Sequence, residues 1–80
     1  MTVTVRFFAS YAEVLGCQSF VLGLANGATV QDVVSHVAAL PGAAGVPPAP
    51  LIAVNHSYAN LSHLLADGDE VAIIPPVAGG

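Results

Sequence analysis

Residues 29–38, TVQDVVSHVA, restrict how the rest of the chain can be arranged. Thr29 stands where a helix N-cap is expected, and Asp32 falls in the first turn, near the positive end of the helix dipole. Apolar residues follow at the i, i+3, i+4, i+7 and i+8 positions of one buried helix face. These are Val30, Val33, Val34, Val37 and Ala38. The segment therefore predicts one amphipathic helix, ended by Pro41 and Gly42, that must pack against another layer.

The segments on both sides of this helix have the period of strands. Residues 3–7 alternate apolar and polar side chains, and residues 20–24 repeat the pattern. After the helix, residues 51–54 (LIAV) and 70–74 (EVAII) are short, mostly apolar runs typical of buried strands. The sequence thus predicts two strands before the helix and two after it.

The connecting segments carry turn and loop signals. Asn26-Gly27 and Asp67-Gly68-Asp69 predict tight turns, and the Pro-rich residues 41–50 predict a surface loop. Residues 10–15 read as a short helix that begins in a capping box and stops at Gly16. Residues 60–65 predict a single helical turn.

This order of elements predicts an α+β fold of the β-grasp, or ubiquitin-like, type. It has a mixed sheet of four to five strands with one main helix packed on one face. The predicted domain covers residues 1–74, and residues 75–80 form an extended C-terminal Gly-Gly tail.

The composition excludes several classes of function. The chain has 80 residues, 55% of them hydrophobic but only 8% charged, with a net charge of −4 and a single base, Arg6. Nucleic acid and anionic membrane surfaces are excluded as partners because both require several basic side chains. A lone Cys17 cannot form an internal disulfide, and we identify neither a membrane-spanning run nor a signal peptide, so we expect a cytoplasmic protein. Six charged side chains cannot cover the surface of so small a domain, so we also expect an exposed apolar patch that binds a protein partner.

The last six residues, PPVAGG, are the most informative segment. Pro75 and Pro76 end the final strand and favour a stiff, extended exit from the sheet. Gly79 and Gly80 carry no side chains, so a narrow channel in another protein could admit them. The Gly80 carboxylate would be delivered to the far end of that channel, and because a carboxylate is a poor electrophile, chemistry there needs activation by ATP in a partner.

The sequence resembles the MoaD/ThiS sulfur-carrier family over essentially its whole length. The resemblance is carried by residues 3–9 (VTVRFFA), 28–33 (ATVQDV), 53–55 (AVN) and above all 65–80 (LADGDEVAIIPPVAGG). The last stretch is highly specific, because the turn, strand, Pro-Pro and Gly-Gly follow in fixed order to the end. The scarcity of Lys and Arg and the Pro- and Ala-rich residues 41–50 depart from the family pattern.

The resemblance implies a non-catalytic small subunit of molybdopterin synthase that acts as a sulfur-donating co-substrate. A ubiquitin-activating-like adenylyltransferase would adenylate Gly80 with ATP, and sulfur from a persulfide would convert it to a thiocarboxylate. The tail, through Pro75, Pro76, Val77, Ala78 and Gly79, would thread into the large synthase subunit. There, sulfur would pass to cyclic pyranopterin monophosphate in molybdenum cofactor biosynthesis. The family complex is a heterotetramer with two large subunits, and the small subunit itself binds no cofactor or metal.

Other reactive side chains suggest no second site. His36, His56 and His63 stand in separate segments without ligand spacing, and Cys17 has no nearby cation to lower its pKa. The acidic residues 67–70 are explained by solvated turn chemistry, and Arg6 points away from the apolar strand face, toward an acid or a partner.

Three alternatives remain open at this level. The chain could carry sulfur for thiamine or cysteine synthesis, it could be a ubiquitin-like protein modifier, or it could be an interaction domain with an inert tail.

Overall fold

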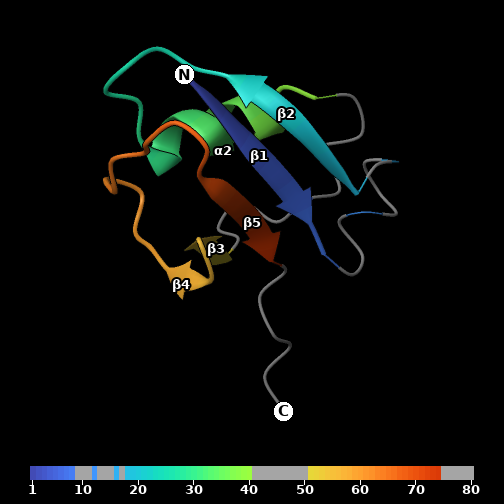
Figure 1. Cartoon of the computed structure of the whole chain (residues 1–80). Helices are drawn as coiled ribbons and strands as arrows, with labels where there is room; N and C mark the ends of the chain where they lie inside the picture. Colours follow the sequence, from blue (N-terminus) through green and yellow to red (C-terminus); the bar gives the residue numbers. More distant parts are fainter. Residues whose placement is uncertain (9–11, 13–15, 17, 41–50, 75–80) are drawn as a thin grey trace.

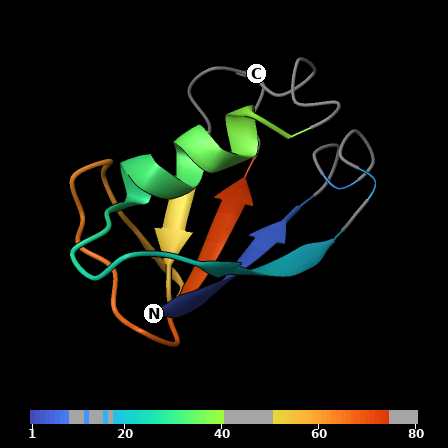
Figure 2. The ribbon, with the colours of Figure 1, turned by 90° about the horizontal axis from the view of Figure 1, so that it is seen from above.

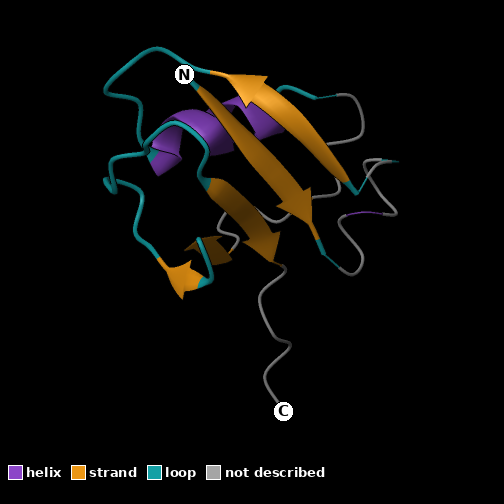
Figure 3. Ribbon diagram, viewed as in Figure 1, coloured by secondary structure: helices purple, strands orange, loops and turns teal. Residues whose placement is uncertain are grey.

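The computed structural model describes residues 1–8, 12, 16, 18–40 and 51–74, with the elements arranged as in Figure 1 and Figure 3. In chain order these elements are β1 (Thr2–Phe7), β2 (Ser19–Gly23), α2 (Val30–Ala38), β3 (Leu51–Val54), β4 (Ser57–Tyr58) and β5 (Glu70–Ile74). No helix in this part of the chain has the length and apolar character needed to cross a membrane.

The strands form one mixed sheet in the order β2-β1-β5-β3-β4. β1 and β5 are parallel, while β1–β2, β3–β5 and β3–β4 are antiparallel. The parallel pair at the centre joins the first strand to the last one, with the helix between them in sequence. This arrangement is the β-grasp predicted from the pattern of apolar residues.

Alternation along the strands sorts their side chains onto two faces. The inner face is closed by α2, which lies across one side of the sheet (Figure 2). The core between them consists of Val3, Val5, Phe7, Leu22, Val30, Val33, Val37, Ile52, Val54, Leu65, Val71 and Ile73. From the predicted helix stripe, Val30, Val33 and Val37 are buried and Val34 is half-buried, but Ala38 is exposed, because it lies at the margin of the stripe, about 100° round the helix from Val37.

The predicted turns are confirmed by backbone geometry. Gly27 and Gly68 have φ values of +88° and +86°, and Gly16 has +73°, conformations that favour glycine. The predicted helix over residues 10–15 lies outside the described residues except for Ala12, as does the loop over residues 41–50.

The predicted helical turn over residues 60–65 is wrong. The segment instead lies against the start of α2, where the Leu61 and His63 carbonyls accept the backbone N–H groups of Gln31 and Val30, at 2.9 and 3.1 Å. Capping the helix in this way holds the segment in an irregular, partly extended path, which ends in an isolated bridge between Thr29 and Leu64.

Candidate functional site

The outward face of the sheet carries an apolar surface where β5 ends. The strand registers place Leu51 opposite Ile74, and Ala53 between Ala72 and Tyr58. The Phe8 N–H group donates to the Ile73 carbonyl at 3.3 Å, which brings Phe8 to the same end of β5. We call this surface the docking patch, and its members are Phe8, Leu51, Ala53, Tyr58, Ala72 and Ile74.

The docking patch is both exposed and hollowed. Tyr58 is 76% exposed, Phe8 is 41% exposed and Leu51 is 39% exposed, values that are high for large apolar side chains. A depression of about 300 Å³ is lined by all patch residues except Leu51, together with His56 and Glu70. These exposed side chains confirm the apolar patch expected from the scarcity of charge. An exposed apolar patch with a polar rim is typical of a protein-binding surface.

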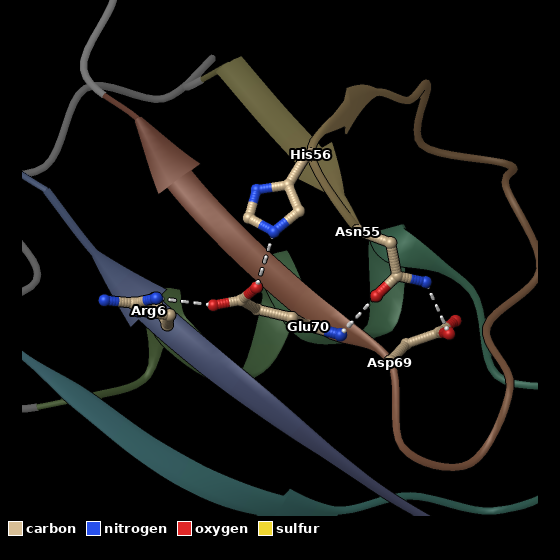
Figure 4. Close-up of polar contacts among 5 residues, drawn as sticks. All are labelled: Arg6, Asn55, His56, Asp69 and Glu70. Atoms are coloured by element: carbon tan, nitrogen blue, oxygen red, sulfur yellow. Dashed lines mark hydrogen bonds and ion pairs between the residues drawn. The ribbon is translucent and has the colours of Figure 1, made fainter.

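The polar rim of the patch is organised around Glu70 (Figure 4). Arg6 donates from Nη1 to Glu70 Oε1 at 2.7 Å, and His56 Nε2 lies 3.4 Å from Glu70 Oε2. The Arg6 guanidinium also lies 5.6 Å from the centre of the Phe8 ring, a cation–π distance. Arg6, the only Lys or Arg of the sequence, thus connects the polar rim to the apolar patch. Of the two roles left open for Arg6, pairing with an acid is confirmed.

The turn that carries His56 leads from β3 into β4, a strand that sequence reasoning missed. Asn55 and His56 have φ values of 50° and 73°, so both central residues of the β3–β4 hairpin are left-handed, as a two-residue type I′ turn requires. Asn55 fixes this turn to the start of β5. Its N–H donates to the Glu70 carbonyl at 2.8 Å, its Oδ1 accepts the Glu70 N–H at 3.0 Å, and its Nδ2 donates to Asp69 Oδ1 at 2.9 Å.

The acidic turn before β5 is held by hydrogen bonds. Asp67 Oδ1 accepts the Thr2 N–H at 2.7 Å, and Asp69 Oδ2 accepts the Ala66 N–H at 2.8 Å. The Ala66 bond, followed by the Asn55 amide, lowers the pKa of Asp69, and the hydrogen bond from Arg6 lowers the pKa of Glu70. Both carboxylates are therefore stabilised in the charged form, and the turn that precedes the patch is fixed in place.

The structure places the remaining candidate residues as follows. The tail residues Pro75, Pro76, Val77, Ala78, Gly79 and Gly80 lie outside the described residues, as does Cys17. His36 lies on α2 with its ring 6.2 Å from that of Phe20, and His63 lies in the segment before β5. Within the described ranges, no three His, Cys, Asp or Glu side chains gather in a way that could hold a metal. Ile74, which belongs to the docking patch, is covalently joined to the first residue of the tail.

Comparison with known proteins extends this picture. The ThiS family model matches residues 5–80. The chain is 37% identical to the molybdopterin synthase sulfur carrier subunit of Chlamydomonas reinhardtii, covering 100% of both chains. It is also 37% identical to the Escherichia coli K12 subunit of the same name, covering 98% of this chain and 99% of that one.

Two solved structures are similar over their whole length. The crystal structure of SAMP1 from Haloferax volcanii has a TM-score of 0.84 at 29% identity, with 100% of both chains covered. A chain from the complex of subunits 1 and 2 of the molybdopterin-converting factor of Helicobacter pylori 26695 has a TM-score of 0.74 at 30% identity, again with 100% of both chains covered.

Proposed function

Because this chain belongs to the ThiS family, we propose that it is the sulfur-carrier subunit of a molybdopterin synthase. Its Gly80 carboxylate would be adenylated, converted to a thiocarboxylate, and used to donate sulfur to cyclic pyranopterin monophosphate. Support comes from the sulfur carrier subunits of molybdopterin synthase that match the full chain at 37% identity.

The observation that carries the proposal is the position of the docking patch. Ile74 is the last residue of β5 and a member of the patch, and Pro75 follows it directly in the chain. A partner that covers the patch is therefore next to the first residue of the tail. Two prolines restrict the backbone at that point, so docking and delivery of the tail would be coupled.

The chemistry proposed for the tail comprises activation of Gly80, loading with sulfur and transfer of that sulfur. The Gly80 carboxylate attacks the α-phosphate of ATP, pyrophosphate leaves, and an acyl adenylate forms. A persulfide sulfur attacks the acyl carbon and displaces AMP, and a thiol then cleaves the acyl disulfide to leave the thiocarboxylate. The thiocarboxylate sulfur attacks a carbon of the pterin precursor and displaces an oxygen substituent there. Water then cleaves the acyl–sulfur bond, which leaves the sulfur on the precursor and returns the Gly80 carboxylate. The activating enzyme binds ATP and a persulfide donor supplies the sulfur, while the carrier supplies only its C-terminal carboxyl group.

The proposed partners follow from this cycle. A ubiquitin-activating-like adenylyltransferase loads the tail, and the large synthase subunit unloads it, in a cytoplasmic heterotetramer with two copies of each subunit. The Helicobacter pylori structure of subunit 1 with subunit 2 supports the large subunit as a partner. The apolar patch and its polar rim fit a partner surface that is apolar at its centre and polar at its border.

Intact-mass analysis tests the proposal directly. The full chain is incubated with the activating enzyme, ATP and a persulfide donor, and we expect the mass increase for exchange of one oxygen for sulfur. A chain that lacks Gly80 is the control and should show no increase. Capture of the loaded chain by a molybdopterin synthase large subunit supports this pathway. Stable capture by a thiazole or cysteine synthase instead would overturn the pathway while leaving the sulfur-carrier chemistry in place.

A protein modifier is the second candidate, favoured by the TM-score of 0.84 to SAMP1, a small archaeal modifier protein. The activating step is shared, but the amine of a lysine in another protein would attack the acyl adenylate, which forms an isopeptide bond and releases AMP. The chain has no lysine of its own, so chains linked through its own lysines are excluded. High-mass conjugates in a cell lysate that disappear when Gly80 is deleted would favour this function.

A further inference from the structure

The outer edge of β2 is the second surface of the fold with unused binding capacity. β2 is the first strand in the sheet order, so only β1 pairs with it within the described residues. We propose that this edge pairs with the β2 strand of a second copy of the chain, which would form a symmetric antiparallel dimer with a continuous sheet.

Hydrogen bonding shows which groups of β2 face outward. Leu24 exchanges backbone hydrogen bonds with Met1, and Phe7 donates to the Gln18 carbonyl at 2.8 Å. Because hydrogen-bonded pairs alternate along an antiparallel ladder, Leu22 and Phe20 form the bonded pairs between these ends. The N–H and C=O groups of the intervening residues, Ser19, Val21 and Gly23, therefore point away from β1.

These three residues are complementary to themselves. In an antiparallel pairing centred on Val21, each Val21 lies opposite its copy, and each Ser19 lies opposite Gly23 of the other chain. Each of these pairs exchanges two backbone hydrogen bonds. A side chain added at Gly23 would meet nothing within 4 Å, so the Ser19 side chain opposite it has open space. Val21, which is 69% exposed, would pack against its copy.

The charge distribution favours a second copy as the occupant. Exposed edge strands are usually protected by Lys, Pro or a bulge, and β2 (SFVLG) contains neither lysine, proline nor an acid. Among the described residues, all acids lie on α2, in the turn before β5 or at its start: Asp32, Asp67, Asp69 and Glu70. As far as the described residues go, two copies can therefore meet edge to edge without placing like charges in the interface, despite the net charge of −4.

The dimer would leave the docking patch accessible. β1 separates β2 from β5, so the patch and the tail junction stay outside the new contact. The two copies of β5 would run in opposite directions, and their tails would start from opposite ends of the joined sheet. A five-residue contact buries less surface than a standard interface, so we expect a Kd on the order of 0.1–1 mM.

Sedimentation velocity and amide exchange test the proposal on the full chain, from tens of micromolar to about 2 mM. We expect the sedimentation coefficient to rise with concentration and the amides of Ser19, Val21 and Gly23 to become protected at the same time. Val21→Pro removes an N–H group that faces away from β1 and should leave a monomer, while Val21→Thr keeps both the N–H group and the branched shape and should dimerise as before.

Two results would overturn the proposal. One is a chain that stays monomeric at the highest concentration, and this holds even if its β2 edge pairs with a different protein. The other is dimerisation that persists in Val21→Pro or that protects the docking patch instead of β2. If Val21→Pro fails to fold, Val21→Lys is the deciding variant. It keeps the backbone N–H group, but it places two ammonium groups opposite each other at the centre of the strand pairing. The Kd of the dimer should then rise at least tenfold.

Discussion

Tyr58→Ala should weaken binding of the large synthase subunit far more than it weakens the fold. Tyr58 lies on β4, a two-residue edge strand, and is 76% exposed, so the folded monomer gains little from its side chain. On the docking patch, the same ring forms one wall of the depression and offers an aromatic surface, the type of side chain that most often dominates binding energy.

The size of the effect follows from the exposed area. A tyrosine buries about 150–250 Å² when fully covered, so its 76% exposed fraction leaves roughly 110–190 Å² for a partner to cover. At about 25 cal/mol per Å², complete burial is worth about 3–5 kcal/mol. Alanine keeps part of that surface and the contact is never complete, so we expect a loss of about 2 kcal/mol, or about 30-fold in Kd.

Isothermal titration of the large subunit measures this loss, and urea unfolding checks the fold. The matched control is Leu64→Ala, because Leu64 is 67% exposed but lies outside the patch. We expect Leu64→Ala to bind within about twofold of the native chain. Equal affinities for Tyr58→Ala and Leu64→Ala would show that the patch does not contact the large subunit and would refute the reasoning.

Three further perturbations test other parts of the structure. Gly79→Ala should slow sulfur transfer in the reconstituted synthase without changing the melting temperature; normal transfer would contradict the threading of a bare tail. Ile73→Ala should lower the free energy of urea unfolding by about 2–5 kcal/mol, because Ile73 is 1% exposed in the core. Ile74→Ala should instead weaken binding of the large subunit with little loss of stability. A stability loss for Ile74→Ala and a binding loss for Ile73→Ala would place the patch on the wrong face of the sheet. Asp69→Asn should lower the free energy of unfolding at pH 7. Because the folded pKa of Asp69 lies below its unfolded value, this loss of stability should shrink as the pH falls below about 4. Urea unfolding at pH 7, 5 and 3 measures the loss, and a loss that does not change with pH would count against the bonds of Asp69 to Ala66 and Asn55.

Periodicity was sufficient to predict the layers of the fold. The alternation in residues 3–7, the apolar run in residues 70–74 and the valines of α2 indicate which segments meet in the core, because burial of apolar area dominates folding. Turn signals in the sequence placed the turns at Gly27 and Gly68, where the positive φ favours glycine.

The site was harder to predict, because it depends on contacts between distant segments. The β3–β4 hairpin turns at Asn55-His56, and histidine is not the glycine that usually marks the second position of such a turn, so β4 was missed. Its conformation is held from outside, by the bonds from Asn55 to Asp69 and Glu70. Likewise, the local turn at Asn60, which accepts the Ser62 and His63 N–H groups, does not continue as a helix, because the Leu61 and His63 carbonyls cap the amides of α2.

The order of strands also determines when this domain can fold during translation. β1 leaves the ribosome first and β5 last among the five strands, yet these two are neighbours at the centre of the sheet. A nascent chain that stops before Glu70 holds the β1–β2 and β3–β4 pairs but lacks the strand that joins them. The sheet can therefore close only after synthesis has passed residue 74. Truncated chains would remain open to proteases, and this would remove products that cannot present a tail.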